Sequence, residues 1–213
     1  MLAILPIRAG SQRVKHKNIR MINGKPLYIY MVDTLKKVEQ IEKILINTDY
    51  QIIHNAFSND SKVDVMARDE ELRDNCNINL VIDRVLKSCK YEYFLQTHVT
   101  NPLLKASTIN DAIVCFKEQS STHDSLFSVT KVQKRFWSSN TKPLNHSFFD
   151  EPTTQNLEPY YEENSCLYVF SRESFDKNKN RLGTKPIMYE IPKDESWDID
   201  DEEDMQLVVK LMS

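Results

Sequence analysis

Five basic or potentially basic side chains lie within eleven residues near the start of the chain, between Arg8 and Asn18. They follow a short apolar run, residues 2–7, and the same segment contains Gly10, one of only 3 glycines in the protein. A strand that leads into a cationic loop can surround a polyphosphate, because backbone N–H groups approach the anion while Arg and Lys supply charge. A solvated basic loop would have the same composition, so the spacing alone leaves both interpretations open.

Two acidic side chains near the end of the chain, Asp198 and Asp200, flank Ile199. In an extended segment both carboxylates project to one side while Ile199 faces the core. Paired carboxylates opposite phosphates suit Mg²⁺ (or Mn²⁺), since Mg²⁺ takes one or two protein carboxylates and keeps several waters. Residues 198–204 hold six acids, which would also suit a helix start. We expect both: a metal at Asp198 and Asp200, and a helix whose first turn contains 201–203, with Asp204 structural.

The elements that must position these groups alternate between strand and helix patterns. This alternation predicts a mostly parallel sheet covered by helices. The pattern predicts strands at 2–7, 43–47, 63–66, 93–96, 125–131, 165–170 and 186–191. It predicts helices that begin near Pro26, cover 78–90, follow an N-cap at Ser107 and cover 201–212.

The alternation is interrupted between Val132 and Glu163. This segment holds three prolines and the apolar rings of Phe136, Trp137, Phe148 and Phe149. A loop of this length inside a compact domain needs a reason, and its aromatic content argues against disorder. We expect an inserted arm at 132–163 whose prolines prevent regular structure and whose rings pack against another surface.

Composition excludes several classes of protein. A formal net charge of -3 gives no overall field that would recruit nucleic acid or an anionic membrane. No apolar run approaches the roughly 20 residues of a bilayer span, and the apolar start is too short for a signal peptide. The cysteines, at 76, 89, 115 and 166, show neither zinc-site nor disulfide spacing. We therefore expect one domain over residues 1–213, located in the cytoplasm.

Four segments carry a resemblance to a known family. The first, R-x-G-S-x-R-x-x-x-K-N at residues 8–18, resembles the signature of the CMP-sugar synthetases, the cytidylyltransferases that activate sialic acid, related nonulosonic acids and 3-deoxy-manno-octulosonate. Leu95-Gln96 followed by Asn101-Pro102-Leu103 is similar to the family's L-Q-P-T-S-P-L-R strand end. The N-S-C-L-Y-V-F segment at 164–170 resembles its N-G-A-I-Y, and Asp198-Ile199-Asp200 with Asp204 resembles its D-I-D-x-x-x-D.

The resemblance implies a fold and a reaction. The fold is a three-layer, Rossmann-like α/β nucleotidyltransferase with a protruding arm at 132–163 through which two subunits form a homodimer. The reaction transfers CMP from CTP to the anomeric hydroxyl of an acidic keto-sugar and releases pyrophosphate. Catalysis of this kind depends mainly on positioning and on cations that offset phosphate charge.

The resemblance also assigns roles to residues. It implies nucleotide binding by Arg8, Ala9, Gly10, Ser11, Arg13, Lys17, Asn18, Arg68 and Asn77. A one-residue gap would move the last role to Asn75, and Asn77 could equally be the N-cap of the helix at 78, or serve both purposes. Catalysis is expected of Arg8, Lys17, Asp198 and Asp200, and acceptor binding of Gln96, His98 and Asn164. Lys15 and His16 are expected to be solvated.

The acceptor site departs from the family pattern. Glu158, Glu162 and Glu163 stand where Arg residues that meet the sugar's carboxylate are usual. Unpaired Glu residues would repel a carboxylate strongly if water were excluded. Three explanations stay open: the Glu side chains point elsewhere, another cation such as Lys105 or Arg135 serves, or the acceptor carries a neutral or positive group there.

Two other functions compete with the favoured one. A nucleotidyltransferase of the same architecture could use another NTP, or take 3-deoxy-manno-octulosonate, a modified sugar or a sugar-1-phosphate as acceptor. Enzymes that use another NTP or a sugar-1-phosphate more often carry a longer Gly-rich loop. A non-catalytic nucleotide-binding protein could also keep the fold. The presence of Arg8, Lys17, Asp198 and Asp200 together argues against this last possibility.

Overall fold

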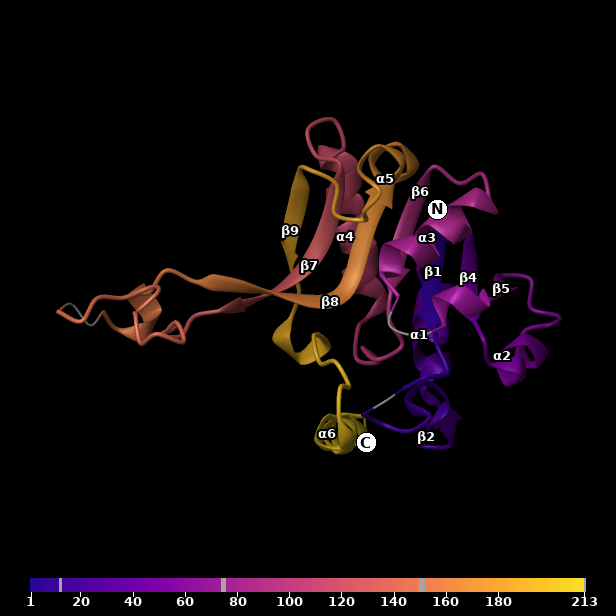
Figure 1. Cartoon of the computed structure of the whole chain (residues 1–213), viewed down its shortest axis with the longest axis horizontal. Helices are drawn as coiled ribbons and strands as arrows, with labels where there is room; N and C mark the ends of the chain where they lie inside the picture. Colours follow the sequence, from indigo (N-terminus) through magenta and orange to yellow (C-terminus); the bar gives the residue numbers. More distant parts are fainter. Residues whose placement is uncertain (12, 74–75, 150–151, 213) are drawn as a thin grey trace.

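One sheet of seven strands lies at the centre of the molecule (Figure 1). The computed structural model describes residues 1–213 except 12, 74–75, 150–151 and 213. The strands are β1 (Leu2–Ile7), β4 (Lys43–Thr48), β5 (Val63–Ala67), β6 (Tyr93–Thr97), β7 (Ser125–Val132), β8 (Tyr160–Ser171) and β9 (Pro186–Glu190). Their order is β5-β4-β1-β6-β8-β7-β9, and among the described pairings within this sheet only those of β8 with β6 and β7 are antiparallel.

Helices cover both faces of this sheet. They are α1 (Leu27–Lys36), α2 (Gln51–Ala56), α3 (Ile78–Lys87), α4 (Ala106–Gln119), α5 (Arg172–Asn178) and α6 (Glu202–Leu211). Alternate side chains of β1 point to opposite faces: Ala3 and Leu5 pack with α1, α2 and α4, whereas Leu2 and Ile4 pack with α3 and α5. The expected three-layer α/β fold is confirmed.

A third apolar cluster joins the two ends of the chain. Val14 and Ile22, from the segment after β1, pack with Ile199, Met205 and Val208, which belong to α6 and the residues before it. Figure 1 accordingly shows α6 beside the small hairpin β2 (Met21–Ile22) and β3 (Lys25–Pro26). This cluster holds the basic loop next to the acid pair, although they are almost a full chain length apart in sequence.

The arm, residues 132–163, leaves the sheet as a continuation of β7 and β8 and extends far from the domain (Figure 1). Val132 pairs with Tyr160 at its base, and Trp137 pairs with Pro143 further out. The expectation that prolines exclude regular structure here is therefore wrong in part. Strand β8 begins at Tyr160, because the chain from there to Glu163 still pairs with β7.

Helix boundaries differ slightly from those expected. Helix α4 begins at Ala106 with Lys105 as its N-cap, so Ser107 lies inside the first turn. The Lys105 N–H donates to Glu195 Oε2 at 3.0 Å, so a distant segment supplies a hydrogen-bond acceptor at the start of the helix.

None of the described helices combines the length and the apolar character that crossing a membrane requires.

Candidate active site

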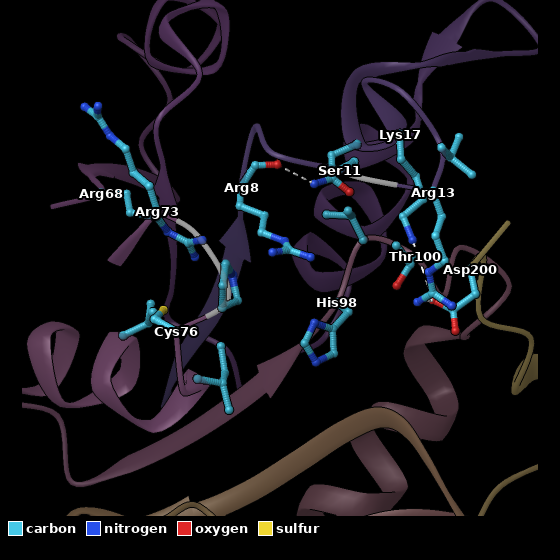
Figure 2. A pocket seen from close by; sticks show the side chains of 16 residues that line it. Arg8, Ser11, Arg13, Lys17, Arg68, Arg73, Cys76, His98, Thr100 and Asp200 are labelled. Carbon is cyan, nitrogen blue, oxygen red and sulfur yellow. Dashed lines mark hydrogen bonds and ion pairs between the residues drawn. The ribbon is translucent and has the colours of Figure 1, made fainter. Parts of the chain in front are cut away.

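A pocket of about 420 Å³ lies where the parallel strands β5, β4, β1 and β6 end. Arg8 directly follows β1, Arg68 follows β5 and His98 follows β6, so three strand ends deliver side chains to one hollow (Figure 2). Ligands of open α/β sheets bind at this edge, beyond the carboxyl ends of the strands. The topology therefore brings together residues that the sequence analysis selected from separate motifs.

The pocket is strongly cationic. In the part of the chain that the structure describes, its ionic side chains are five cations and one carboxylate, namely Arg8, Arg13, Lys17, Arg68, Arg73 and Asp200. Ser11, Asn18, His98 and Thr100 add polar groups. Such a wall favours a ligand that carries several negative charges, since the low-dielectric walls of a cleft focus the field of like charges.

The basic loop is fixed by contacts at both of its ends. The Asn18 side chain donates to the Arg8 carbonyl at 2.8 Å, and Val14 is buried in the third apolar cluster. Lys17 donates to the Ile199 carbonyl and is mostly buried, whereas Lys15 and His16 are exposed and lie outside the pocket lining. Lys15 and His16 are thus solvated, as expected, whereas Lys17 lines the pocket.

The backbone of this loop does not form the expected cradle of N–H groups. The Ala9 N–H donates to Asp49 Oδ1 at 2.7 Å, and the Ser11 N–H donates to the Ala9 carbonyl at 2.9 Å. Among the described residues, the lining includes Ser11 but neither Ala9 nor Gly10. Side chains, and not backbone N–H groups, therefore present positive charge to the pocket in this conformation.

The acid pair lies beside the loop. Asp200 accepts from Arg13 at 2.6 Å and lies 3.9 Å from the Lys17 ammonium. Asp198 is buried deeper, and its Oδ1 has no hydrogen-bond partner among the described residues. Burial raises the pKa of Asp198, and a hydrogen bond with Thr100 opposes that shift.

Both carboxylates act on Lys17. Burial lowers the pKa of Lys17, and the charges of Asp198 and Asp200 raise it in return. A buried carboxylate oxygen without a partner is costly unless a cation or a donor satisfies it. The residues present therefore fit a divalent cation held by few protein ligands, and no cluster of three or more His, Cys, Asp or Glu suited to a metal occurs in the described ranges.

The acids after this pair serve the helix. Asp201 is the N-cap of α6 and accepts from the backbone N–H groups of Glu203 and Asp204 at 2.9 and 3.0 Å. Asp204 Oδ2 accepts from the N–H groups of Asp201 and Asp200 at 3.1 and 2.9 Å, which completes a capping box. The expected structural role of Asp204 is confirmed, and Asp201 is the cap rather than part of the first turn.

The opposite wall of the pocket contains a second group of polar side chains. Arg68 is buried, and its Nε donates to Asn47 Oδ1 at 2.9 Å. Burial lowers the pKa of Arg68 from its very high ordinary value. Arg73 and Cys76 share this wall (Figure 2). Sequence reasoning missed Asn47, Arg73 and Cys76, because no motif marks them.

Asn77 takes the structural alternative that the sequence left open. Its Oδ1 accepts from the Asn79 N–H at 2.9 Å and so caps α3. It is not among the described lining residues of the pocket, and the other candidate, Asn75, lies outside the described residues.

The predicted acceptor residues are divided between two places. Gln96 is fully buried, and its Nε2 donates to the Thr97 carbonyl at 3.0 Å and to His98 Nε2 at 3.1 Å. Its Oε1 accepts from Arg181, a residue that sequence reasoning missed. Gln96 therefore connects Arg181 to the pocket-lining ring of His98.

Asn164 lies away from this group, in an irregular part of β8. Between Phe127 and Val129 of β7 the register with β8 shifts, and Asn164 lies on β8 within that shift. Its Oδ1 accepts from Ser128 Oγ at 2.6 Å, and its Nδ2 donates to Thr130 Oγ1 at 2.9 Å. The structure thus gives Asn164 internal partners and does not bring it to the pocket; its role in acceptor binding stays a prediction.

His98 should make the stability of the protein depend on pH. Burial, followed by the charges of Arg181 and Lys17, lowers the pKa of His98 from 6.5 to about 3. Below pH 6.5 the imidazole of His98 binds a proton in the unfolded chain but not in the folded chain. The free energy of unfolding therefore falls as the pH drops toward 3. Part of the ring faces the pocket, so we expect less than the ~1.4 kcal/mol per pH unit that one full proton gives.

Urea unfolding at pH 7 and pH 5 measures this effect. His98→Gln should lose less stability between the two pH values than the wild type does, because glutamine does not titrate. The exposed His16→Gln variant is the control and should keep the wild-type dependence. An identical loss in His98→Gln and wild type would contradict the assignment.

Comparison with known proteins agrees with this geometry. A family model described as cytidylyltransferase matches residues 2–208. The chain belongs to the cytidylyltransferase family. The matched range includes the basic loop, the pocket walls and the acid pair, and the resemblance found in the motifs is confirmed at this level.

Two curated relatives show how far the likeness extends. The CMP-N,N'-diacetyllegionaminic acid synthase of Legionella pneumophila is 29% identical over 228 residues, which cover 100% of this chain and 96% of the relative. An N-acylneuraminate cytidylyltransferase of Escherichia coli is 27% identical over 220 residues, which cover 99% of this chain and 52% of the relative. The chain therefore spans about half the length of the Escherichia coli relative.

Solved structures share the fold. A CMP:2-keto-3-deoxy-manno-octonic acid synthetase complexed with CTP superposes with a TM-score of 0.73 at 13% identity, over 99% of this chain and 97% of that chain. A 4-diphosphocytidyl-2C-methyl-D-erythritol synthase from Anaerococcus prevotii superposes with a TM-score of 0.69 at 12% identity, over 99% and 95%. Both likenesses concern the fold.

Proposed function

We propose that the protein transfers CMP from CTP to the anomeric hydroxyl of an acidic keto-sugar of the sialic or nonulosonic acid type. The observation that carries this proposal is the pocket of five cations and one carboxylate at the strand ends of a chain in the cytidylyltransferase family. The hydroxyl oxygen bonds to the α-phosphorus and its proton passes to solvent, while the bond from that phosphorus to the oxygen that bridges it to the β-phosphate breaks. Pyrophosphate leaves.

The cations of the basic loop bind the triphosphate in this scheme. Arg8, Arg13 and Lys17 offset the charge that builds on the transferred phosphate and on the leaving pyrophosphate. Lys17 is well suited to this work, because its contact with the Ile199 carbonyl fixes the ammonium beside the acid pair. Arg68, oriented by Asn47, faces the same hollow and is placed to contact the nucleotide from the other wall.

Asp198 and Asp200 would hold Mg²⁺ or Mn²⁺. The buried oxygen of Asp198 that has no partner among the described residues, and the half-exposed carboxylate of Asp200, provide the one or two protein ligands that Mg²⁺ requires. When bound, the ion supplies positive charge against the phosphate oxygens. The protein's own contribution is to fix these carboxylates, through the hydrogen bonds of Thr100 and of the α6 cap.

One measurement tests the function: pyrophosphate release, with each of the four NTPs, with and without Mg²⁺. The acceptors are N-acetylneuraminate, N,N'-diacetyllegionaminate and 3-deoxy-manno-octulosonate, with sugar-1-phosphates as a second class. We expect release with CTP and at least one keto-sugar acid only. Turnover of a sugar-1-phosphate, or with another NTP, would show a different nucleotidyltransferase, and no turnover with any pair would contradict the proposal.

We also propose that two copies form a homodimer through the arm. Trp137, Phe148 and Phe149 are 49%, 63% and 100% exposed in the isolated chain. Trp137 and Phe148 lie edge to face, with ring centroids 5.4 Å apart, so they form a patch rather than scattered rings. Exposed apolar patches mark interaction sites, aromatic residues are enriched in interfaces, and two-fold pairing is the commonest arrangement.

Sedimentation at micromolar concentration tests the dimer. The wild type should sediment at twice the chain mass of 25.0 kDa, and a Trp137→Ser/Phe148→Ser variant should sediment at the chain mass itself. Ile52→Ser, which alters an exposed apolar residue of α2, is the control and should stay dimeric. A wild-type monomer with full activity would contradict the proposal. We also infer a cytoplasmic location, since CTP, the proposed substrate, is made inside the cell.

A further inference from the structure

A keto-sugar acid brings a carboxylate to the site along with its reacting hydroxyl. Both groups are attached to the same anomeric carbon, so the carboxylate must lie within a few ångströms of the transferred phosphate. The cations of the basic loop are already required by the triphosphate. Arg68 and Arg73 line the opposite wall, which the proposed scheme gives to the nucleotide, so a further cation is sought on the His98 side; this step rests on the proposed function.

The two cations that the sequence suggested for this purpose are engaged elsewhere. Lys105 forms ion pairs with Glu195 at 3.1 Å and Asp194 at 3.6 Å. Arg135 donates to the Pro152 carbonyl within the arm at 2.8 Å. Neither belongs to the described lining of the pocket; Arg181 is not a lining residue either, but its charge acts on the ring of His98, which is.

Arg181 lies on the required side. Its guanidinium donates to Gln96 Oε1 and is centred 3.5 Å from the middle of the Tyr168 ring. Gln96 in turn donates to His98, which lines the pocket. Arg181 therefore sits behind the His98 wall, connected to it through a single fully buried amide.

The loop that carries Arg181 has a defined shape. Asn180 Oδ1 accepts from the N–H groups of Leu182 and Gly183 at 2.9 and 2.8 Å, and the Arg181 N–H donates to Asn79 Oδ1 at 3.2 Å. Gly183 has φ +62°, and a Cβ there would lie 2.4 Å from the Asp124 carboxylate. The positive φ strains any other residue at this position, and the hydrogen bonds of Asn180 and Asn79 fix the loop around Arg181.

Arg181 also lies near Glu163, one of the acids that the sequence analysis expected to repel a carboxylate substrate. Tyr168 stacks under the guanidinium, and its hydroxyl donates to Glu163. Burial lowers the pKa of Arg181, and the charges of Tyr168 and Glu163 oppose that shift. A guanidinium is not deprotonated in proteins, so it stays positive. The Glu163 carboxylate is thus paired with the Tyr168 hydroxyl, and its charge acts on Arg181.

We propose that Arg181 binds the carboxylate of the acceptor sugar, and that Gln96 and Tyr168 position its guanidinium for this contact. A guanidinium has five N–H donors in a planar fork that matches a carboxylate. Donors serve Gln96 and Tyr168, which leaves others of the five for the ligand. Gln96, whose amide already has partners at both ends, acts as a positioning residue in this arrangement.

The test combines two variants with two acceptors. The acceptors are the keto-sugar acid that the wild type uses and its amide, in which the carboxylate is replaced by a neutral group. For Arg181→Gln we expect KM for the acid to rise roughly 10- to 100-fold, as for the loss of a charged hydrogen bond, with KM for CTP unchanged. Arg181→Lys should recover part of the loss, and the amide should be used equally by wild type and Arg181→Gln.

Lys179→Gln is the matched control, because it removes a nearby positive charge that is exposed and already paired with Asp83 and Asp176. It should keep the wild-type KM for the acid. Thermal unfolding and calorimetric CTP binding show whether each variant is folded. Equal losses for acid and amide, or an unchanged KM for the acid in Arg181→Gln, would overturn the inference. Failure of the wild type with every acid would instead overturn the proposed function.

Discussion

Asp198→Asn and Asp200→Asn should each reduce turnover by roughly two orders of magnitude or more, while the fold stays intact. Both changes keep the shape of the side chain and remove the negative charge that the proposed metal requires. Asp198→Asn should also unfold at the same temperature as the wild type or at a higher one in EDTA. The reason is that its buried Oδ1, without a partner in the described structure, is costly as a charged atom and less so as an amide.

Mn²⁺ binding followed by electron paramagnetic resonance provides a second readout besides activity. Both variants should bind Mn²⁺ in the presence of CTP more weakly than the wild type does. Asp204→Asn is the contrasting variant, because Asp204 caps α6: it should lower the unfolding temperature and leave Mn²⁺ affinity largely unchanged. Near-normal turnover in both Asp198→Asn and Asp200→Asn would contradict the metal assignment.

Lys17→Ala and Arg8→Ala should weaken CTP binding and turnover, each by roughly 10- to 100-fold or more, because each removes a cation from the pocket. Lys15→Ala removes the same charge only two residues away, on an exposed position outside the pocket lining, and should have little effect. Calorimetric titration with CTP and steady-state kinetics measure both quantities. A loss in Lys15→Ala as large as that in Lys17→Ala would show that the loop has been assigned in the wrong register.

Local patterns predicted most of the fold, because each strand and helix buries a face with a simple period. The apolar run of β1 alternates between two layers, and the helices after β1 and β6 carry their apolar residues at helical spacing. The basic loop and the acid pair were also found by type and spacing. The resemblance implied that they serve one site. What brings them together is a tertiary contact that nothing in the sequence marked, the cluster of Val14, Ile199 and Met205.

Residues whose role depends on distant partners were not predictable from local sequence. Arg181 lies in a loop with several other cations, and only the fold places it over Tyr168 and against Gln96. In the sequence Asn47 is an ordinary residue near the end of a strand, and only the fold brings Arg68 into hydrogen-bond contact with it. Asn77 and Asn164 were assigned to ligands by resemblance, whereas the structure gives both side chains backbone or side-chain partners within the protein.

The strand pairing at the base of the arm determines how freely the length and sequence of the outer arm can change. Val132 and Tyr160 are cross-strand partners, so the chain between them departs from the sheet and returns to it at one point. The entropy cost of closing a loop grows only with the logarithm of its length, and residues can be added or removed beyond this pair at small cost to the domain. Assembly and chemistry are thereby separable: the outer arm can diverge, or be trimmed to a short turn, while the strand ends that build the pocket keep their spacing.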